Sequence, residues 1–117
     1  LGGLSHAIGH QLGSSTGMVH GYTSCIVLPY VIEFNGEAAP ERVAELARAA
    51  GLGTDDLAGG LRELIARLGL PSRISEATDR IADLDAIAAE TMREVAIANN
   101  PRPVTEAAVR RILELAQ

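Results

Sequence analysis

Three histidines, all within the first 20 residues, are the side chains best suited to chemistry in this chain. They are His6, His10 and His20. His6 and His10 are four residues apart, so on a helix they would project from one face with Cβ atoms roughly 6 Å apart. Imidazole is the commonest metal ligand in proteins, and histidines at this spacing suit a divalent ion. A loop of small residues at 13–17 would let His20 turn back toward that face and complete a set of three ligands.

The same residues are compatible with three unrelated polar or core histidines, because a single His-x-x-x-His pair is only moderately specific. The nearest carboxylate in the sequence is Glu33, which lies at the far end of the following apolar segment. A catalytic metal usually has three or more protein ligands and an open position. The spacing alone therefore leaves open whether the chain holds a complete metal site, part of one or none.

The elements that must position these histidines are expected to be helices. Apolar residues make up 47% of the chain and aromatic residues only 3%, so the core must consist of Leu, Ile, Val and Ala, which suits closely packed helices. Apolar spacing predicts a helix over 4–12 and a loop over 13–17. The almost continuously apolar segment 18–34 is long enough to favour a buried helix. The expected fold is all-α, with five or six helices in a bundle-like domain.

The later helices are predicted from capping residues and apolar periodicity. The residues expected to begin them are Pro40, Thr54, Asp83 and Thr105. The core face expected on the helix after Thr54 consists of Leu57, Leu61, Leu64, Ile65 and Leu68. Residues 72–80 are expected to be a connector, and residues 99–103 a rigid turn.

Charge and cysteine content exclude several classes of protein. The 15 acidic and 10 basic residues give a net charge of -5, which argues against a nucleic-acid partner. No apolar run approaches the roughly 20 residues that span a bilayer, so no membrane partner is expected. The single cysteine, Cys25, cannot form an internal disulfide and is expected to be a buried thiol. A cytoplasmic location fits this composition.

Four segments, in order, resemble the carboxy-terminal half of the iron-containing alcohol dehydrogenases. They are Gly3-Leu4-Ser5-His6-Ala7-Ile8-Gly9-His10-Gln11-Leu12-Gly13, His20-Gly21, Leu28-Pro29-Tyr30-Val31-Ile32-Glu33-Phe34-Asn35 and Asn100-Pro101-Arg102-Pro103-Val104-Thr105. The maleylacetate reductase branch of the family is also similar, and the resemblance does not separate the two branches. It implies that residues 1–117 are a carboxy-terminal metal-binding and catalytic domain of the dehydroquinate synthase-like type. The amino-terminal nucleotide-binding domain of the family would be absent from this chain.

The resemblance also implies separate roles for the three histidines. His6 and His20 correspond to metal ligands, and His10 corresponds to the histidine near the nicotinamide and substrate that helps to move the proton. The remaining ligands, an Asp and another His, would lie before Leu1. The implied cofactors are a divalent metal, Fe²⁺ or Zn²⁺, and NAD(P) in the intact enzyme.

The implied activity is interconversion of alcohols and carbonyls, or reduction of maleylacetate, by a homo-oligomeric enzyme that acts on a small molecule. The chain alone is expected to be inactive. Arg102 is open to two readings, as a ligand of a cofactor phosphate or acidic substrate, or as a surface arginine of a turn. The alternative to the enzyme reading is a non-catalytic helical module that binds metal or dimerises and is complete in itself.

Overall fold

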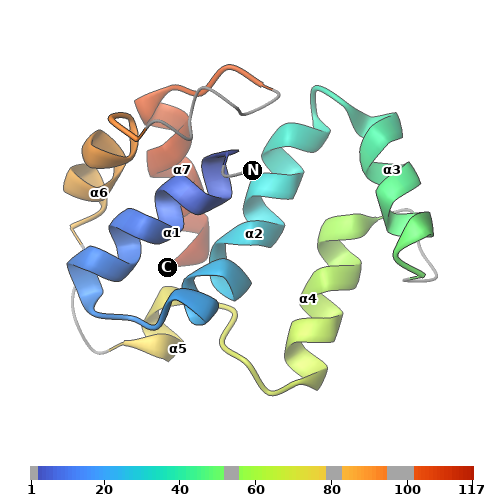
Figure 1. The fold of residues 1–117 in the computed structure, drawn as a ribbon, viewed down its shortest axis with the longest axis horizontal. Helices are drawn as coiled ribbons and strands as arrows, with labels where there is room; N and C mark the ends of the chain where they lie inside the picture. The colour runs from blue at the N-terminus through green and yellow to red at the C-terminus, as the bar shows by residue number, and fades with distance from the viewer. Residues whose placement is uncertain (1–2, 52–55, 79–82, 95–101) are drawn as a thin grey trace.

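The computed structural model describes residues 3–51, 56–78, 83–94 and 102–117, except for the side chain of His20. Within these ranges the chain forms seven helices and no strand, which confirms the all-α prediction (Figure 1). The helices are α1 (Gly3–Thr16), α2 (His20–Gly36), α3 (Pro40–Ala49), α4 (Leu57–Arg67), α5 (Ile74–Ala77), α6 (Leu84–Thr91) and α7 (Glu106–Ala116). The count exceeds the predicted five or six because the expected connector at 72–80 contains the short helix α5, whose Ile74 is fully buried.

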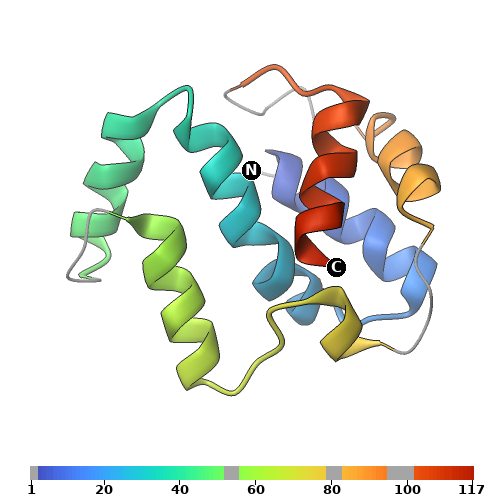
Figure 2. The ribbon, with the colours of Figure 1, turned by 180° about the vertical axis from the view of Figure 1, so that it is seen from behind.

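Helices α1 and α2 lie at the centre of the fold. On one side, α6 packs on α1, and α7 packs on both α6 and α2. On the other side, α3 and α4 pack on α2 (Figures 1 and 2). Apolar side chains of α1 and α2 fill the interior between these layers. The fully or almost fully buried ones are Leu4, Ala7, Ile8 and Leu12 of α1 and Ile26, Val27 and Val31 of α2. One face of α1 is thereby fixed in the core.

The predicted loop at residues 13–17 is wrong for most of its length, because α1 continues to Thr16. The Thr16 hydroxyl donates to the Leu12 carbonyl at 2.7 Å, so this polar residue is satisfied within the helix. The chain turns at Gly17, whose φ of 73° favours glycine, and the Gly17 N–H donates to the Gly13 carbonyl at 2.8 Å. The link from α1 to α2 is therefore short.

Helices α1 and α2 approach closely at Gly9. A Cβ added at Gly9 would lie 3.1 Å from Thr23 Oγ1, and Thr23 is fully buried. One turn later, a Cβ at Gly13 would meet the Met18 carbonyl at an ordinary 3.5 Å. Glycine at position 9 thus lets α1, with its histidines, lie directly against the first turns of α2.

The face predicted for α4 needs correction. Ile65 is buried, but Leu64 and Leu68 are 43% and 63% exposed, while the small residues Ala58 and Gly60 are buried. The reason is that α4 lies at the edge of the molecule and packs mainly on α2 and α3, so the described helices leave part of its apolar surface uncovered. The predicted N-cap Thr54 lies outside the described residues.

The other helix starts agree with the prediction. Asp83 accepts a hydrogen bond from the Ala86 N–H, and Thr105 accepts one from the Ala108 N–H, both at 3.1 Å. Pro40 is the first residue of α3. At α4 the capping side chain is Asp56, which accepts from the Gly59 N–H at 3.0 Å. Among the described helices, none has the length and apolar character to cross a membrane.

Candidate functional site

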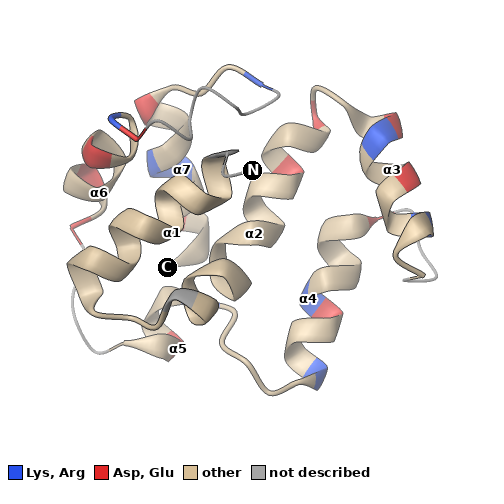
Figure 3. Cartoon of the chain, in the orientation of Figure 1, with Lys and Arg blue, Asp and Glu red and all other residues tan. Residues whose placement is uncertain are grey.

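Helix α1 presents His6 and His10 on the face opposite its core residues. Both side chains are exposed, and their rings lie one above the other with centroids 6.4 Å apart and planes at 26°. The first Asp, Glu, Lys or Arg of the sequence is Glu33, so this part of the protein carries no formal charge of its own. Figure 3 shows α1 as an uncharged helix, with charged residues on the surrounding elements. The two histidines therefore share one uncharged, outward-facing surface.

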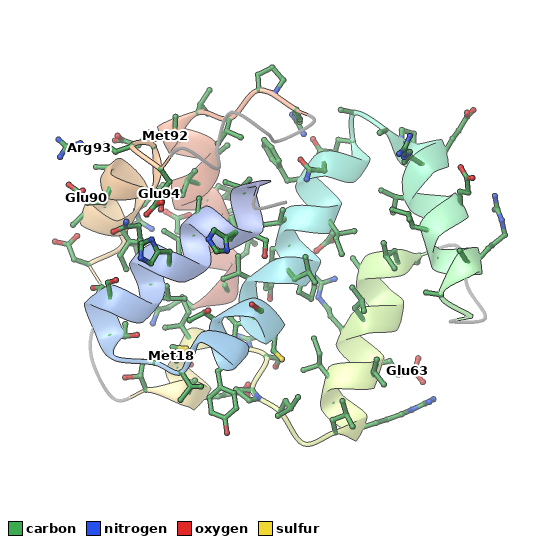
Figure 4. The ribbon with its side chains drawn as sticks, in the orientation of Figure 1. Met18, Glu63, Glu90, Met92, Arg93 and Glu94 are labelled. Atoms are coloured by element: carbon green, nitrogen blue, oxygen red, sulfur yellow. The ribbon has the colours of Figure 1, made fainter. Side chains whose placement is uncertain are left out.

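The carboxylate nearest this surface comes from the opposite end of the chain. His10 Nδ1 lies 2.7 Å from Glu94 Oε1, and the Gln11 side-chain amide donates to the same oxygen at 2.5 Å. Glu94 follows the last turn of α6, which packs on α1, and Figure 4 shows it beside α1. Adjacent side chains of α1 thus share one carboxylate oxygen.

The two partners of Glu94 change its acidity. The hydrogen bond from Gln11, followed by that from His10, lowers the pKa of the Glu94 carboxyl below its ordinary value of 4.5. Glu94 is therefore ionised at neutral pH. Its side chain is 19% exposed, whereas that of His10 is 60% exposed, so the carboxylate is the more enclosed of the two groups.

Sequence reasoning missed Glu94. It is 84 residues from His10, and the only carboxylate considered as a neighbour of the histidines was Glu33. Glu33 instead pairs with Arg62 of α4. No local pattern around Glu94 marks it, because the contact depends on how α6 packs against α1.

His20 is the first residue of α2, but its side chain lies outside the described part of the structure. The predicted cluster of three histidines therefore stays a prediction. Among the described residues no group of three His, Cys, Asp or Glu side chains could hold a metal ion.

The spacing of the His6 and His10 rings is wide for two ligands of one ion. Their stacked rings are far apart, and one nitrogen of His10 already faces Glu94. Two nitrogens bound to one Zn²⁺ would each lie about 2.0–2.1 Å from it. The imidazole of His6 and, from the sequence, that of His20 have the chemistry that an Fe²⁺ or Zn²⁺ ion prefers in a protein ligand.

Arg102 and Cys25, the two other residues singled out in the sequence, are both partly enclosed by neighbouring side chains or backbone. Arg102 Nη1 donates to the Phe34 carbonyl at 2.7 Å and to Glu37 Oε2 at 2.8 Å, and its guanidinium lies 4.2 Å from the centre of the Phe34 ring. These contacts give Arg102 a role at the carboxyl end of α2. Cys25 is half-buried rather than buried, and it lines a cavity of about 230 Å³ together with Arg62.

Comparison with known proteins assigns this chain to a family of proteins. Residues 2–117 match the family model described as Fe-containing alcohol dehydrogenase family, C-terminal. The chain therefore belongs to the iron-containing alcohol dehydrogenase family.

Individual relatives agree with this assignment. The chain is 37% identical to a maleylacetate reductase of Rhizobium sp. strain MTP-10005, over 97% of this chain and 31% of that protein. It is 29% identical to the 1,3-propanediol dehydrogenase of Citrobacter freundii, over 97% of this chain and 32% of that protein. The crystal structure of an iron-containing alcohol dehydrogenase from Corynebacterium glutamicum superposes with a TM-score of 0.81 at 38% identity, over 97% of this chain and 31% of that one. The chain thus spans about a third of the length of these relatives.

Proposed function

We propose that this chain is the carboxy-terminal, helical part of an NAD(P)-dependent oxidoreductase that interconverts alcohols and carbonyls, or reduces maleylacetate, at a divalent metal site. The observation that carries the proposal is the face of α1 on which the exposed rings of His6 and His10 are neighbours. His10 is hydrogen-bonded to the Glu94 carboxylate. Family membership supports the same reading.

The family motif supports different roles for the histidines. His6 and His20 would hold the ion, Fe²⁺ or Zn²⁺, in agreement with their positions in the family motif. Such an ion supplies Lewis acidity when bound. The other ligands would come from outside residues 1–117. His10, turned toward Glu94, would remain outside the ligand set.

His10 would instead move a proton. Histidine is the side chain most often used for general acid–base catalysis, and such a group must reach the reacting proton directly or through one water. The exposed ring of His10, next to His6 on the same face of α1, could deliver a proton to a substrate oxygen held beside the metal site. Hydride transfer itself belongs to the nicotinamide, which a nucleotide-binding domain would orient.

The surface of the chain is consistent with a missing domain. Val19, Tyr22 and Leu28, all from the apolar segment predicted to be buried, are exposed. We propose that the amino-terminal domain covers this region in the intact protein, and that the chain alone is inactive because nothing in it orients the nicotinamide. Homo-oligomerisation and a cytoplasmic location are further parts of this proposal.

The printed activities of the relatives suggest the substrates to test. They include a maleylacetate reductase, a 1,3-propanediol dehydrogenase and an NAD-dependent methanol dehydrogenase. The experiment is NADH and NADPH oxidation by the full-length protein that contains this chain, loaded with Fe²⁺ or Zn²⁺, with maleylacetate and short aldehydes as substrates. His10→Ala should lower kcat by about 10²–10⁴-fold, as expected for loss of a general acid. Glu90→Gln, an exposed change on α6, is the control and should keep the wild-type rate.

One observation favours the alternative of a dimerisation module. Leu46 of α3, Leu64 of α4 and Leu68 just after α4 are exposed large apolar side chains. If the metal-loaded full-length protein oxidises neither nicotinamide with any of these substrates, yet Leu64→Glu/Leu68→Glu abolishes its self-association, the module reading is correct.

A further inference from the structure

We infer that Glu94 is a positioning residue for His10: its carboxylate holds the Nδ1 side of the imidazole, so that Nε2 is the nitrogen that meets the reacting proton. This inference rests on the proposed role of His10 in proton transfer. The candidate histidine site, which the sequence places on α1 and the start of α2, thereby gains a residue from the segment that follows α6.

The contact geometry fits a positioning role. Glu94 Oε1 lies 2.7 Å from His10 Nδ1 and accepts a 2.5 Å hydrogen bond from Gln11 Nε2. Because Gln11 is the next residue of α1, the carboxylate is held by the helix that carries the imidazole it orients. Glu94 is the more buried partner and His10 the more exposed one, so the ring is held by the carboxylate and still reached by solvent.

The protonation states determine which nitrogen of His10 is available. An ionised carboxylate can only accept hydrogen bonds, so the shared proton must lie on His10 Nδ1. In the neutral imidazole the other nitrogen, Nε2, is then an acceptor and takes up the alcohol proton in the oxidation direction. In the reduction direction the ring begins protonated on both nitrogens and gives the Nε2 proton to the substrate oxygen. A base whose second nitrogen is oriented by a third group is the arrangement found where a histidine transfers protons during catalysis.

The end of α6 is anchored well enough to serve this role. Ile87 and Ala88 are in the core, and fully buried Thr91 donates its hydroxyl to the Ile87 carbonyl at 2.7 Å. Glu90 lies one turn before Glu94, is exposed, and pairs with Arg93 at 3.1 Å. In the described contacts, Glu94 lies against His10, whereas Glu90 pairs with Arg93. Glu90 is therefore a suitable control position for Glu94.

The test uses the full-length, metal-loaded protein with its nicotinamide cofactor. Glu94→Gln keeps the size of the side chain but removes its charge, and it should lower kcat by about 10–100-fold, the range seen when a partner that orients a histidine is lost. KM should stay unchanged, because the substrate does not touch Glu94. Glu94→Asp, which restores the carboxylate, should recover part of the loss. Glu90→Gln should have wild-type kcat.

The His10→Ala/Glu94→Gln double variant separates positioning from an independent effect. If Glu94 acts through His10, the double variant is no slower than His10→Ala. Multiplied losses, or a Glu94→Gln protein with wild-type kcat, would overturn the inference. A His10→Ala protein with wild-type kcat would instead overturn the proposed role of His10, so the two failures are distinguishable.

A spectroscopic measurement gives a readout that does not depend on turnover. With ¹⁵N-labelled histidine, the ring shifts of His10 in the wild-type protein should report a proton on Nδ1 and an unprotonated Nε2. Glu94→Gln should shift this balance toward the other tautomer, and Glu90→Gln should leave it unchanged. Identical His10 ring shifts in the wild-type and Glu94→Gln proteins would contradict the inference.

Discussion

The contact between Gly9 and Thr23 gives the sharpest prediction about how the site is held. Gly9→Ala would place a methyl group 3.1 Å from the buried Thr23 Oγ1. Alanine improves the intrinsic helix stability by about 1 kcal/mol, whereas overfilling a well-packed interior typically costs about 1–3 kcal/mol. Because Thr23 is enclosed on all sides, we expect the steric cost to prevail and the net loss of stability to be about 1 kcal/mol.

Gly13→Ala is the matched control, because position 13 lies one turn further along α1 and an added Cβ would make only ordinary contacts, the nearest at 3.5 Å. It should be neutral or stabilise the protein by up to about 1 kcal/mol. Urea denaturation followed by circular dichroism measures both variants. In a Thr23→Ala background the cost of Gly9→Ala should disappear, since the clashing oxygen is gone. A Gly9→Ala protein at least as stable as Gly13→Ala would refute the close approach of α1 and α2.

Four further changes test other contacts. Gln11→Leu removes the larger cause of the lowered pKa of Glu94, so ¹³C NMR should show the carboxyl titrating closer to 4.5. The stabilisation that ionised Glu94 gives is fully present above the pKa that Glu94 has in the unfolded protein. It is lost as the pH falls through the lower pKa that Glu94 has in the folded protein. The difference in melting temperature between the wild-type and Glu94→Gln proteins should therefore vanish in acid. Thr105→Ala should cost about 1 kcal/mol in a urea titration by removing the N-cap of α7. Arg102→Met should speed hydrogen exchange at the end of α2, where Arg102 binds the Phe34 carbonyl; exchange equal to wild type would argue against that anchor.

Much of the fold could be predicted from local signals. The caps at Asp83 and Thr105, the start at Pro40 and the helical nature of the long apolar segment all follow from short-range chemistry, and the structure agrees. The predicted loop at 13–17 was wrong because small residues often break helices, whereas here α1 continues through them. The Thr16 hydroxyl is hydrogen-bonded within α1, and of these residues Gly17 alone has a positive φ. The exposed Leu64 and Leu68 could not be foreseen, since periodicity gives a face but not the neighbour that covers it.

The site was predictable to a similar degree. The shared face of His6 and His10 follows from their spacing of four residues. The family motif, rather than the spacing, gave them different roles, and the contact of His10 with Glu94 supports that distinction. Glu94 itself could not be found from the sequence, because a contact between residues 84 positions apart depends on the packing of α6 against α1.

The metal content of histidine variants tests the central claim most directly. The full-length protein and its His6→Ala, His20→Ala and His10→Ala variants would be loaded with Zn²⁺ or Fe²⁺, dialysed, and analysed by elemental analysis. We expect the wild-type and His10→Ala proteins to retain the metal, and His6→Ala and His20→Ala to lose it, because only the latter two remove ligands. Loss of metal from His10→Ala, or full retention by His6→Ala, would contradict the division of roles between the histidines of this chain.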